Sequence, residues 1–274
     1  FTSVEVSLGD GDDTAIVNGG NNTARGGAGN DTFTLALEEG ETTLIGGPGD
    51  DRATKTLSSG SDFTLEDYQF RHDVFVVNLD DSLEMLEVTD TDPAGVAVTS
   101  PSPSSSYTWG EAGLTIDASG IIDVSDLYFR APEGQLALYS VGISGTLKME
   151  TRVLTVVNFG SGANADITVE EVDDLIVTRN YVANGGLYTS NGAIDVRLEA
   201  RDAVLTHRSG VITTGNGGGS ITLRADDMDL RAGADSVSGR GSLQVLANSG
   251  KQTYRIGGAG QSPSGNDFTA GDPD

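Results

Sequence analysis

A nine-residue stretch, Gly26–Thr34, restricts the fold of this chain more than any other feature. It reads Gly-Gly-Ala-Gly-Asn-Asp-Thr-Phe-Thr and fits the repeat G-G-x-G-x-D-x-U-x, in which U is apolar, at every position. The glycines permit a tight, partly left-handed turn, Asp31 places a carboxylate inside that turn, and Phe33 points inward from a short strand. One such unit supplies half of a cation site and cannot bury its apolar residue alone. The stretch therefore predicts further copies stacked beside it.

Two more copies of the turn are present. Residues 9–15 repeat it with a leucine in place of the first glycine, and residues 46–53 repeat it completely with an alanine as the apolar residue. Asp13 and Asp31 are 18 residues apart, and Asp31 and Asp51 are 20 residues apart. The first step is two nonapeptides long, and the second is the same step with two extra residues.

The three units, over about residues 8–54, resemble the calcium-binding RTX repeats of bacterial secreted toxins, proteases and large adhesins. In that family two nonapeptides form one turn of a parallel β-roll, and neighbouring turns share Ca²⁺ through aspartates and turn carbonyls. The resemblance implies one ion between Asp13 and Asp31 and another between Asp31 and Asp51. The implied metal-site residues of the three turns are Gly11, Asp12 and Asp13, then Gly29, Asn30 and Asp31, then Gly49, Asp50 and Asp51.

The other side of such a roll, at residues 21–22 and 38–40, departs from the repeat pattern. An alternative interpretation is that all these segments are acidic glycine turns of an ordinary β-protein.

Composition narrows the classes of partner. The 274-residue chain has a net charge of −25 and no cysteine, so disulfides are excluded. Residues 1–100 hold 20 acids and 4 bases, and residues 101–274 hold 21 acids and 12 bases, so the first part is the more acidic. Such a chain repels itself until cations neutralise it, and it has no basic patch for nucleic acid.

No apolar run approaches 18 residues, so no membrane insertion is expected. We expect a piece of a longer extracellular or cell-surface polypeptide.

A second periodicity follows in the C-terminal part. Alternating strand motifs centred on Ile167, Ile194, Ile221 and Leu243 lie 27, 27 and 22 residues apart. A second and a third apolar group follow the strand motifs within these intervals. This spacing is typical of a larger β-solenoid with about three strands per turn.

This region, about residues 134–257, resembles the repetitive β-helical stretches of filamentous-haemagglutinin-like surface proteins and giant bacterial exoproteins. Residues 217–230 and 239–246 carry the resemblance most clearly. The resulting prediction is an all-β chain in which a short calcium-binding parallel β-roll precedes a larger β-domain of solenoid type. A plain antiparallel β-sandwich is the alternative for the second domain. The expected divisions are a roll with capping strands at 1–98, a linker at 99–106, the solenoid-like domain at 107–257 and a Gly/Pro/Asp-rich tail or linker at 258–274.

Catalytic motifs are absent from the sequence. Its two histidines, His72 and His207, lie in different sections beside arginines, and we interpret both as solvated surface residues. Adjacent acids on a strand point to opposite faces, so most acidic pairs are interpreted as turn or surface residues. Asp80–Asp81 and Asp173–Asp174 are candidates for further calcium binding. We therefore predict that the chain is not an enzyme.

The predicted function is a non-catalytic, calcium-stabilised structural segment of a large secreted or cell-surface bacterial protein, as in an adhesin stalk, a surface layer or an extracellular filament. Its expected partners are calcium ions, other copies of itself in a filament or surface layer, and a cell-surface glycan. The alternative is a polysaccharide-active or carbohydrate-binding β-helix protein. That alternative requires basic residues on one face, for which the candidates are Arg197, Arg201, Arg224 and Arg231.

Overall fold

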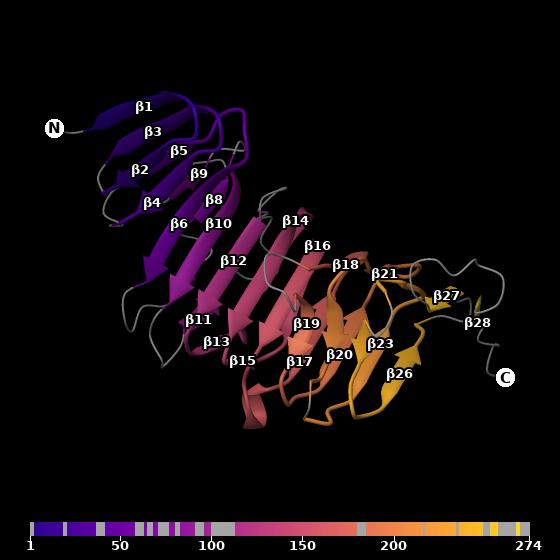
Figure 1. Cartoon of the computed structure of the whole chain (residues 1–274). Coiled ribbons are helices and arrows are strands. Elements are labelled where there is room, and N and C mark those ends of the chain that lie inside the picture. The colour runs from indigo at the N-terminus through magenta and orange to yellow at the C-terminus, as the bar shows by residue number, and fades with distance from the viewer. Residues whose placement is uncertain are drawn as a thin grey trace.

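The computed structural model describes the chain as an all-β protein with long parallel sheets (Figure 1). Strands follow one another across the molecule in nearly sequence order, from the indigo end to the yellow end. Among the described residues the helical element is the short 3-10 helix η2, Gly162–Asn164, and no helix there is long and apolar enough to span a membrane. The described residues are 3–18, 21–36, 42–57, 63–64, 68–70, 77–79, 83–90, 96–99, 113–179, 185–215, 217–233, 236–248, 253–256 and 267–268.

Six strands build the N-terminal part, and they alternate between two parallel sheets. They are β1 Val4–Asp10, β2 Thr14–Val17, β3 Asn22–Ala28, β4 Thr32–Leu35, β5 Thr42–Ile45 and β6 Asp51–Leu57. In one sheet β1 pairs with β3 and β3 with β5; in the other β2 pairs with β4 and β4 with β6. Because side chains alternate along a strand, Ala15, Phe33 and Ala53 face the interior in register, and the last two are fully buried. This pairing places the three repeat turns above one another, as the resemblance to the RTX repeats implies.

The middle strands continue these two sheets, except that four of them form a third sheet. They are β7 Phe63–Thr64, β8 Tyr68–Phe70, β9 Val77–Leu79, β10 Leu83–Asp90, β11 Val96–Thr99, β12 Gly113–Ala118, β13 Ile121–Asp123, β14 Tyr128–Ser140, β15 Gly142–Ser144 and β16 Leu147–Asn158. We expected capping strands here, but β10 pairs in parallel with β6 on one side and with β12 on the other. The sheet therefore extends past this point, because the edge of β6 is met by a strand of matching length and direction. Residues 100–112, which include most of the expected linker, lie outside the described residues.

The long strand β16 marks a change in the repeat. Three successive short strands pair along it: β17 Ile167–Glu171 with its first part, β18 Leu175–Val177 with its middle and β19 Gly186–Thr189 with its last part. One straight strand is thus followed by three strands separated by corners. The first corner, at residues 172–174, breaks the parallel ladder beside Thr151 of β16.

The C-terminal strands stack with the predicted spacing. The remaining strands are β20 Ile194–Leu198, β21 Val204–His207, β22 Val211–Thr213, β23 Ile221–Arg224, β24 Asp227–Leu230, β25 Val237–Ser238, β26 Leu243–Leu246, β27 Thr253–Ile256 and β28 Asp267–Phe268. Ile194 pairs with Ile167 and with Ile221, and Ile221 pairs with Leu243. The second and third apolar groups also pair in parallel, as β18–β21–β24 and β19–β22–β25.

Parallel pairing disagrees with the antiparallel sandwich that the sequence left open. Within the described strands, antiparallel pairing is restricted to β27 and β28. The interior between the sheets is filled by aliphatic side chains one above another, and Ile194, Leu205 and Ile212 are fully buried. Burial of this kind stabilises each large side chain by about 1.5–3 kcal/mol, which favours a self-supporting C-terminal part.

Candidate metal centre

The three repeat turns stack so closely that side chains are excluded from them. Gly29 has a φ of 135°, in the left-handed region, and a Cβ there would overlap the carbonyl oxygen of Gly11 in the turn above. A Cβ at Gly49 would overlap the carbonyl oxygen of Gly29 in the same way. The glycines of the motif therefore bring backbone carbonyl oxygens of successive turns close together.

Two columns of side chains run along these turns. In the inner column, the backbone N–H of Asp13 donates to Oδ1 of Asp31 over 2.9 Å, and the N–H of Asp31 donates to Oδ1 of Asp51 over 2.7 Å. The outer column, Asp12–Asn30–Asp50, is solvent-exposed. There the N–H of Asn30 donates to Oδ1 of Asp12 over 2.8 Å, and the N–H of Asp50 donates to Oδ1 of Asn30 over 3.0 Å. All nine residues predicted for the metal sites thus lie in three adjacent turns.

The inner column is buried although it is acidic. Asp31 is 0% exposed and Asp51 is 1% exposed. The second carboxylate oxygen, Oδ2, of Asp31 and of Asp13 is buried and has no hydrogen-bond partner among the described residues. Burial raises the pKa of Asp51, and the charges of Asp31 and Asp50 act in the same direction, while the N–H of Asp31 opposes them. A buried carboxylate oxygen without a partner is costly, so this arrangement favours a bound cation.

The surroundings of Asp31 contain the oxygen atoms that calcium prefers. A Cβ at Gly26 would overlap Oδ2 of Asp31 and would lie 2.7 Å from the carbonyl oxygen of Gly46. The free carboxylate oxygen and a turn carbonyl oxygen therefore border the same small space beside the Cα of Gly26. Carboxylate and carbonyl oxygens are the ligands of a hard cation such as Ca²⁺.

Among the residues that the structure describes, side chains alone do not form a metal cluster. Within the described part of the chain, no three His, Asp or Glu side chains gather closely enough to hold a metal ion. A calcium ion in the aspartate column would therefore be held by one or two aspartates together with turn carbonyls. That ligand set fits the residues present at the three turns.

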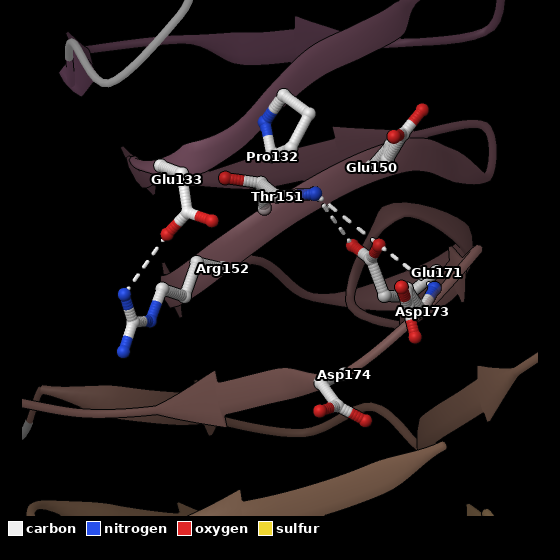
Figure 2. Close-up of a pocket in the computed structure, with 8 residues that line it drawn as sticks. All are labelled: Pro132, Glu133, Glu150, Thr151, Arg152, Glu171, Asp173 and Asp174. Carbon is white, nitrogen blue, oxygen red and sulfur yellow. Dashed lines mark hydrogen bonds and ion pairs between the residues drawn. The ribbon is translucent and has the colours of Figure 1, made fainter. Parts of the chain in front are cut away.

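A second acidic site lies at the corner between β17 and β18 (Figure 2). It is a cavity of about 370 Å³ formed where the pairing of β14 with β16 is irregular between Ala131 and Gln135. The residues that line it are Pro132, Glu133, Glu150, Thr151, Arg152, Glu171, Asp173 and Asp174. Asp173 and Asp174, which the sequence suggested for calcium, thus lie in a cavity wall about 120 residues along the chain from the aspartate column.

Glu171 is the most deeply buried acid of this cavity, at 1% exposed. Its carboxylate accepts the N–H of Thr151 over 3.1 Å and the N–H groups of Val172 and Asp173 over 3.0 and 3.3 Å. The parallel ladder is interrupted where the chain turns at 172–174, so no backbone carbonyl of the neighbouring strand accepts the N–H of Thr151 there. The carboxylate of Glu171 accepts it instead. Burial raises the pKa of Glu171 to about 8, while these N–H donors lower it and the charge of Glu150 raises it further.

The sequence reasoning missed Glu171 and was wrong about His207. We interpreted His207 as a surface residue, but it is 2% exposed, because the alternation of β21 turns Leu205 and His207 to the same inner face. The same period of two in β17 turns Ile167, Val169 and Glu171 inward. Strand alternation was therefore the signal that could have identified both buried groups.

The arginines proposed for a basic face are only partly brought together. Arg197 of β20 and Arg224 of β23 are direct register partners on neighbouring strands. Arg231 instead binds Asp229 through two hydrogen bonds of 2.6 and 2.5 Å. These contacts provide one pair of adjacent arginines.

Several residues singled out in the sequence lie outside the described residues, so their predictions stay open. They are His72 and the pair Asp80–Asp81.

The chain was compared with models of protein families, with curated proteins and with solved structures, and none of them matches it. A function must therefore be inferred from the geometry of its own residues.

Proposed function

We propose that this chain is a calcium-stabilised structural segment of a secreted or cell-surface protein, in which a short β-roll leads into a β-solenoid. The observation that carries the proposal is the inner aspartate column, in which the fully buried Asp31 keeps one carboxylate oxygen without a hydrogen-bond partner among the described residues. The parallel ladders at 18- to 20-residue and 22- to 27-residue steps support the roll and the solenoid.

Calcium would act on folding through charge. Asp13, Asp31 and Asp51 repel one another in one column, and each loses water when the turns stack. An ion held between two turns neutralises the carboxylates, so its binding free energy becomes folding free energy of β1–β6. Where free calcium is scarce, the acidic turns stay separated, and where it is plentiful, they close.

The structural role follows from what the ladders offer. Stacked strands give an extended shape whose length grows with the number of repeats. The chain's expected uses are therefore those of a stalk, a surface layer or an extracellular filament, with other copies of the chain or a cell-surface glycan as partners.

Calcium titration of the whole chain tests the proposal. We expect millimolar Ca²⁺ to increase the β signal in circular dichroism and to raise the melting temperature of a sample first stripped with EGTA, with binding heat by calorimetry. Asp31→Asn should remove most of that response, because Asp31 borders both predicted sites. Glu5→Gln is the matched control. Glu5 of β1 forms an exposed ion pair with Arg25 of β3 at 2.8 Å, and it lies away from the aspartate column. Equal responses of wild type and Asp31→Asn would contradict the proposal.

A second candidate function is action on polysaccharides, and the acidic cavity favours it. With a pKa of about 8, Glu171 holds a proton at neutral pH, which is the state a general acid needs. Incubation with neutral and acidic polysaccharides, followed by measurement of new reducing ends, tests this candidate. Turnover by wild type that is lost in Glu171→Gln would favour it over the structural role.

A further inference from the structure

The interior of the C-terminal ladders contains one imidazole among aliphatic side chains. His207 ends β21 and pairs in register with Val177 of β18. The preceding residue, Thr206, pairs with Asp229, so Leu230 of β24 is next in line beside His207. Val177 and Leu230 are both buried. His207 therefore takes the place of an apolar residue in an otherwise aliphatic ladder.

The ring has no partner that would fully offset the cost of a buried charge. Neither Nδ1 nor Nε2 of His207 has a hydrogen-bond partner among the described residues, and both atoms are buried. Burial lowers the pKa of His207, and the backbone of Gly210 and Ser209 opposes this effect only in part. A protonated ring at this position would be a buried cation, which is far costlier than the neutral ring.

The charged groups on the packed elements do not compensate for such a cation. Arg208 follows His207 directly, and Arg179 follows β18. On β24, Asp229 is occupied by Arg231. Glu171, on the inner face of β17, accepts backbone N–H groups at its own corner. No charged group among the described residues contributes to the shift at His207.

We propose that His207 makes the C-terminal ladders an acid-sensitive switch, in which proton uptake opens the strands around β21. At neutral pH the imidazole is neutral and packs as an apolar ring between Val177 and Leu230. In acid, the opened chain accepts a proton that the packed chain excludes, so the open form gains population. We expect this switch to act without calcium, because β21 pairs with β18 and β24 and not with the strands around the aspartate column.

The sign of the pH dependence follows from the direction of the shift. The folded pKa lies below the ordinary value of 6.5, so above that value both states are neutral and stability does not depend on this group. As the pH falls below 6.5, the unfolded chain binds the proton first and stability is lost. The loss continues until the lowered folded pKa is reached.

Imidazole titration by NMR tests the first step directly. The chain has two histidines, so the His72→Gln variant leaves the His207 signal alone in the spectrum. We expect the His207 imidazole to titrate with a midpoint below pH 6.5, or the strands around β21 to open before the imidazole titrates. A midpoint above 6.5 in the folded protein would overturn the proposal.

Hydrogen exchange at pH 5 in the presence of Ca²⁺ tests the second step. Wild type should exchange faster than His207→Leu in β18, β21 and β24 and equally in β4 and β6. Leucine fits the ladder by size and cannot be protonated, so the two proteins should differ only in the contribution of His207. On going from pH 7 to pH 5, the melting temperature of wild type should fall by about 5 °C relative to that of His207→Leu, because the response of Glu171 is common to both proteins. Equal exchange, or an equal change of melting temperature in both proteins, would refute the switch. If His207→Leu does not fold, the NMR midpoint still decides.

Discussion

The N-terminal strands β1–β6 and the C-terminal strands β17–β26 are both stacked in parallel register around apolar side chains, but the N-terminal turns add a column of acidic residues. The N-terminal turns bury Asp31 and Asp51 in a column of like charges. The C-terminal ladders bury Ile194, Leu205 and Ile212. Both regions share parallel pairing, so the difference teaches that the pairing pattern alone does not determine what stabilises a repeat.

The two interiors respond to different conditions for physical reasons. Aliphatic burial is non-directional and needs no ion, so the C-terminal ladders stabilise themselves. Buried carboxylates favour folding only when a cation offsets their repulsion and lost hydration. The N-terminal part should therefore depend on calcium and the C-terminal part should not.

The largest expected effect is the removal of core side chains. Leu205→Ala should destabilise the C-terminal part by about 2–5 kcal/mol, because the site is fully buried and collapses only partly. Leu44→Ala is the matched variant in the fully buried interior of β5. Denaturant unfolding in a calcium series measures both. We expect Leu44→Ala to raise the calcium concentration at half-folding, and Leu205→Ala to leave it unchanged. A calcium midpoint shifted equally by both variants would show that the two regions fold as one unit.

The next effect concerns Glu171 at the corner between the two kinds of repeat. Its folded pKa of about 8 lies above the ordinary value of 4.5, so the folded chain holds the proton longer than the unfolded chain. This contribution to stability is complete below pH 4.5 and is lost as the pH rises through 8. The loss is on the order of 2–4 kcal/mol.

Chemical unfolding from pH 4.5 to pH 9 checks this prediction for Glu171. Glu171→Gln should remove the alkaline loss, whatever its absolute stability, and the calcium response should stay. An equal alkaline loss in wild type and Glu171→Gln would contradict the buried, protonated carboxyl group.

A pair of glycine variants tests the stacking of the turns with a smaller effect. Gly29 and Gly11 occupy the same position of the nonapeptide and have φ values of 135° and 120°. A Cβ at Gly29 would overlap a carbonyl oxygen, whereas a Cβ at Gly11 meets no atom within 4 Å among the described residues. Gly29→Ala should therefore cost about 1–3 kcal/mol more than Gly11→Ala, since both carry the same backbone strain. Thermal unfolding with calcium measures the difference, and similar losses would argue against turn-on-turn contact.

The smallest effect is expected for surface ion pairs. The side chains of Arg152 and Glu133 are 57% and 60% exposed and lie 2.9 Å apart. Arg152→Ala should change stability by less than about 0.5 kcal/mol, because water and salt screen the pair. A larger coupling energy between Arg152→Ala and Glu133→Ala in a double-mutant cycle would show that this ion pair stabilises the cavity wall despite its exposure.

The sequence predicted the pairings better than the buried polar groups. The spacing of Ile167, Ile194 and Ile221 is confirmed as register, because a parallel ladder requires equal steps between identical positions. The sheet continues past the position of the expected cap, since β10 pairs with the edge of β6 and no local pattern encodes which strand meets an edge.

The candidate site shows the same limit. Asp13, Asp31 and Asp51 lie in one column, as the resemblance to the RTX repeats implies, because the turn geometry is local. The cavity around Glu171 depends on an irregularity in β14 and a corner after β17, which lie far apart in sequence, so residue pattern alone could not reveal it.

One measurement tests the central claim most directly. Hydrogen exchange of the intact chain, read by mass spectrometry in EGTA and in millimolar Ca²⁺, reports each region separately. The account predicts strong calcium-dependent protection in β2, β4 and β6, with protection of β20, β21 and β23 the same in both conditions. Protection of the N-terminal strands that is unchanged by calcium would contradict a cation-dependent roll.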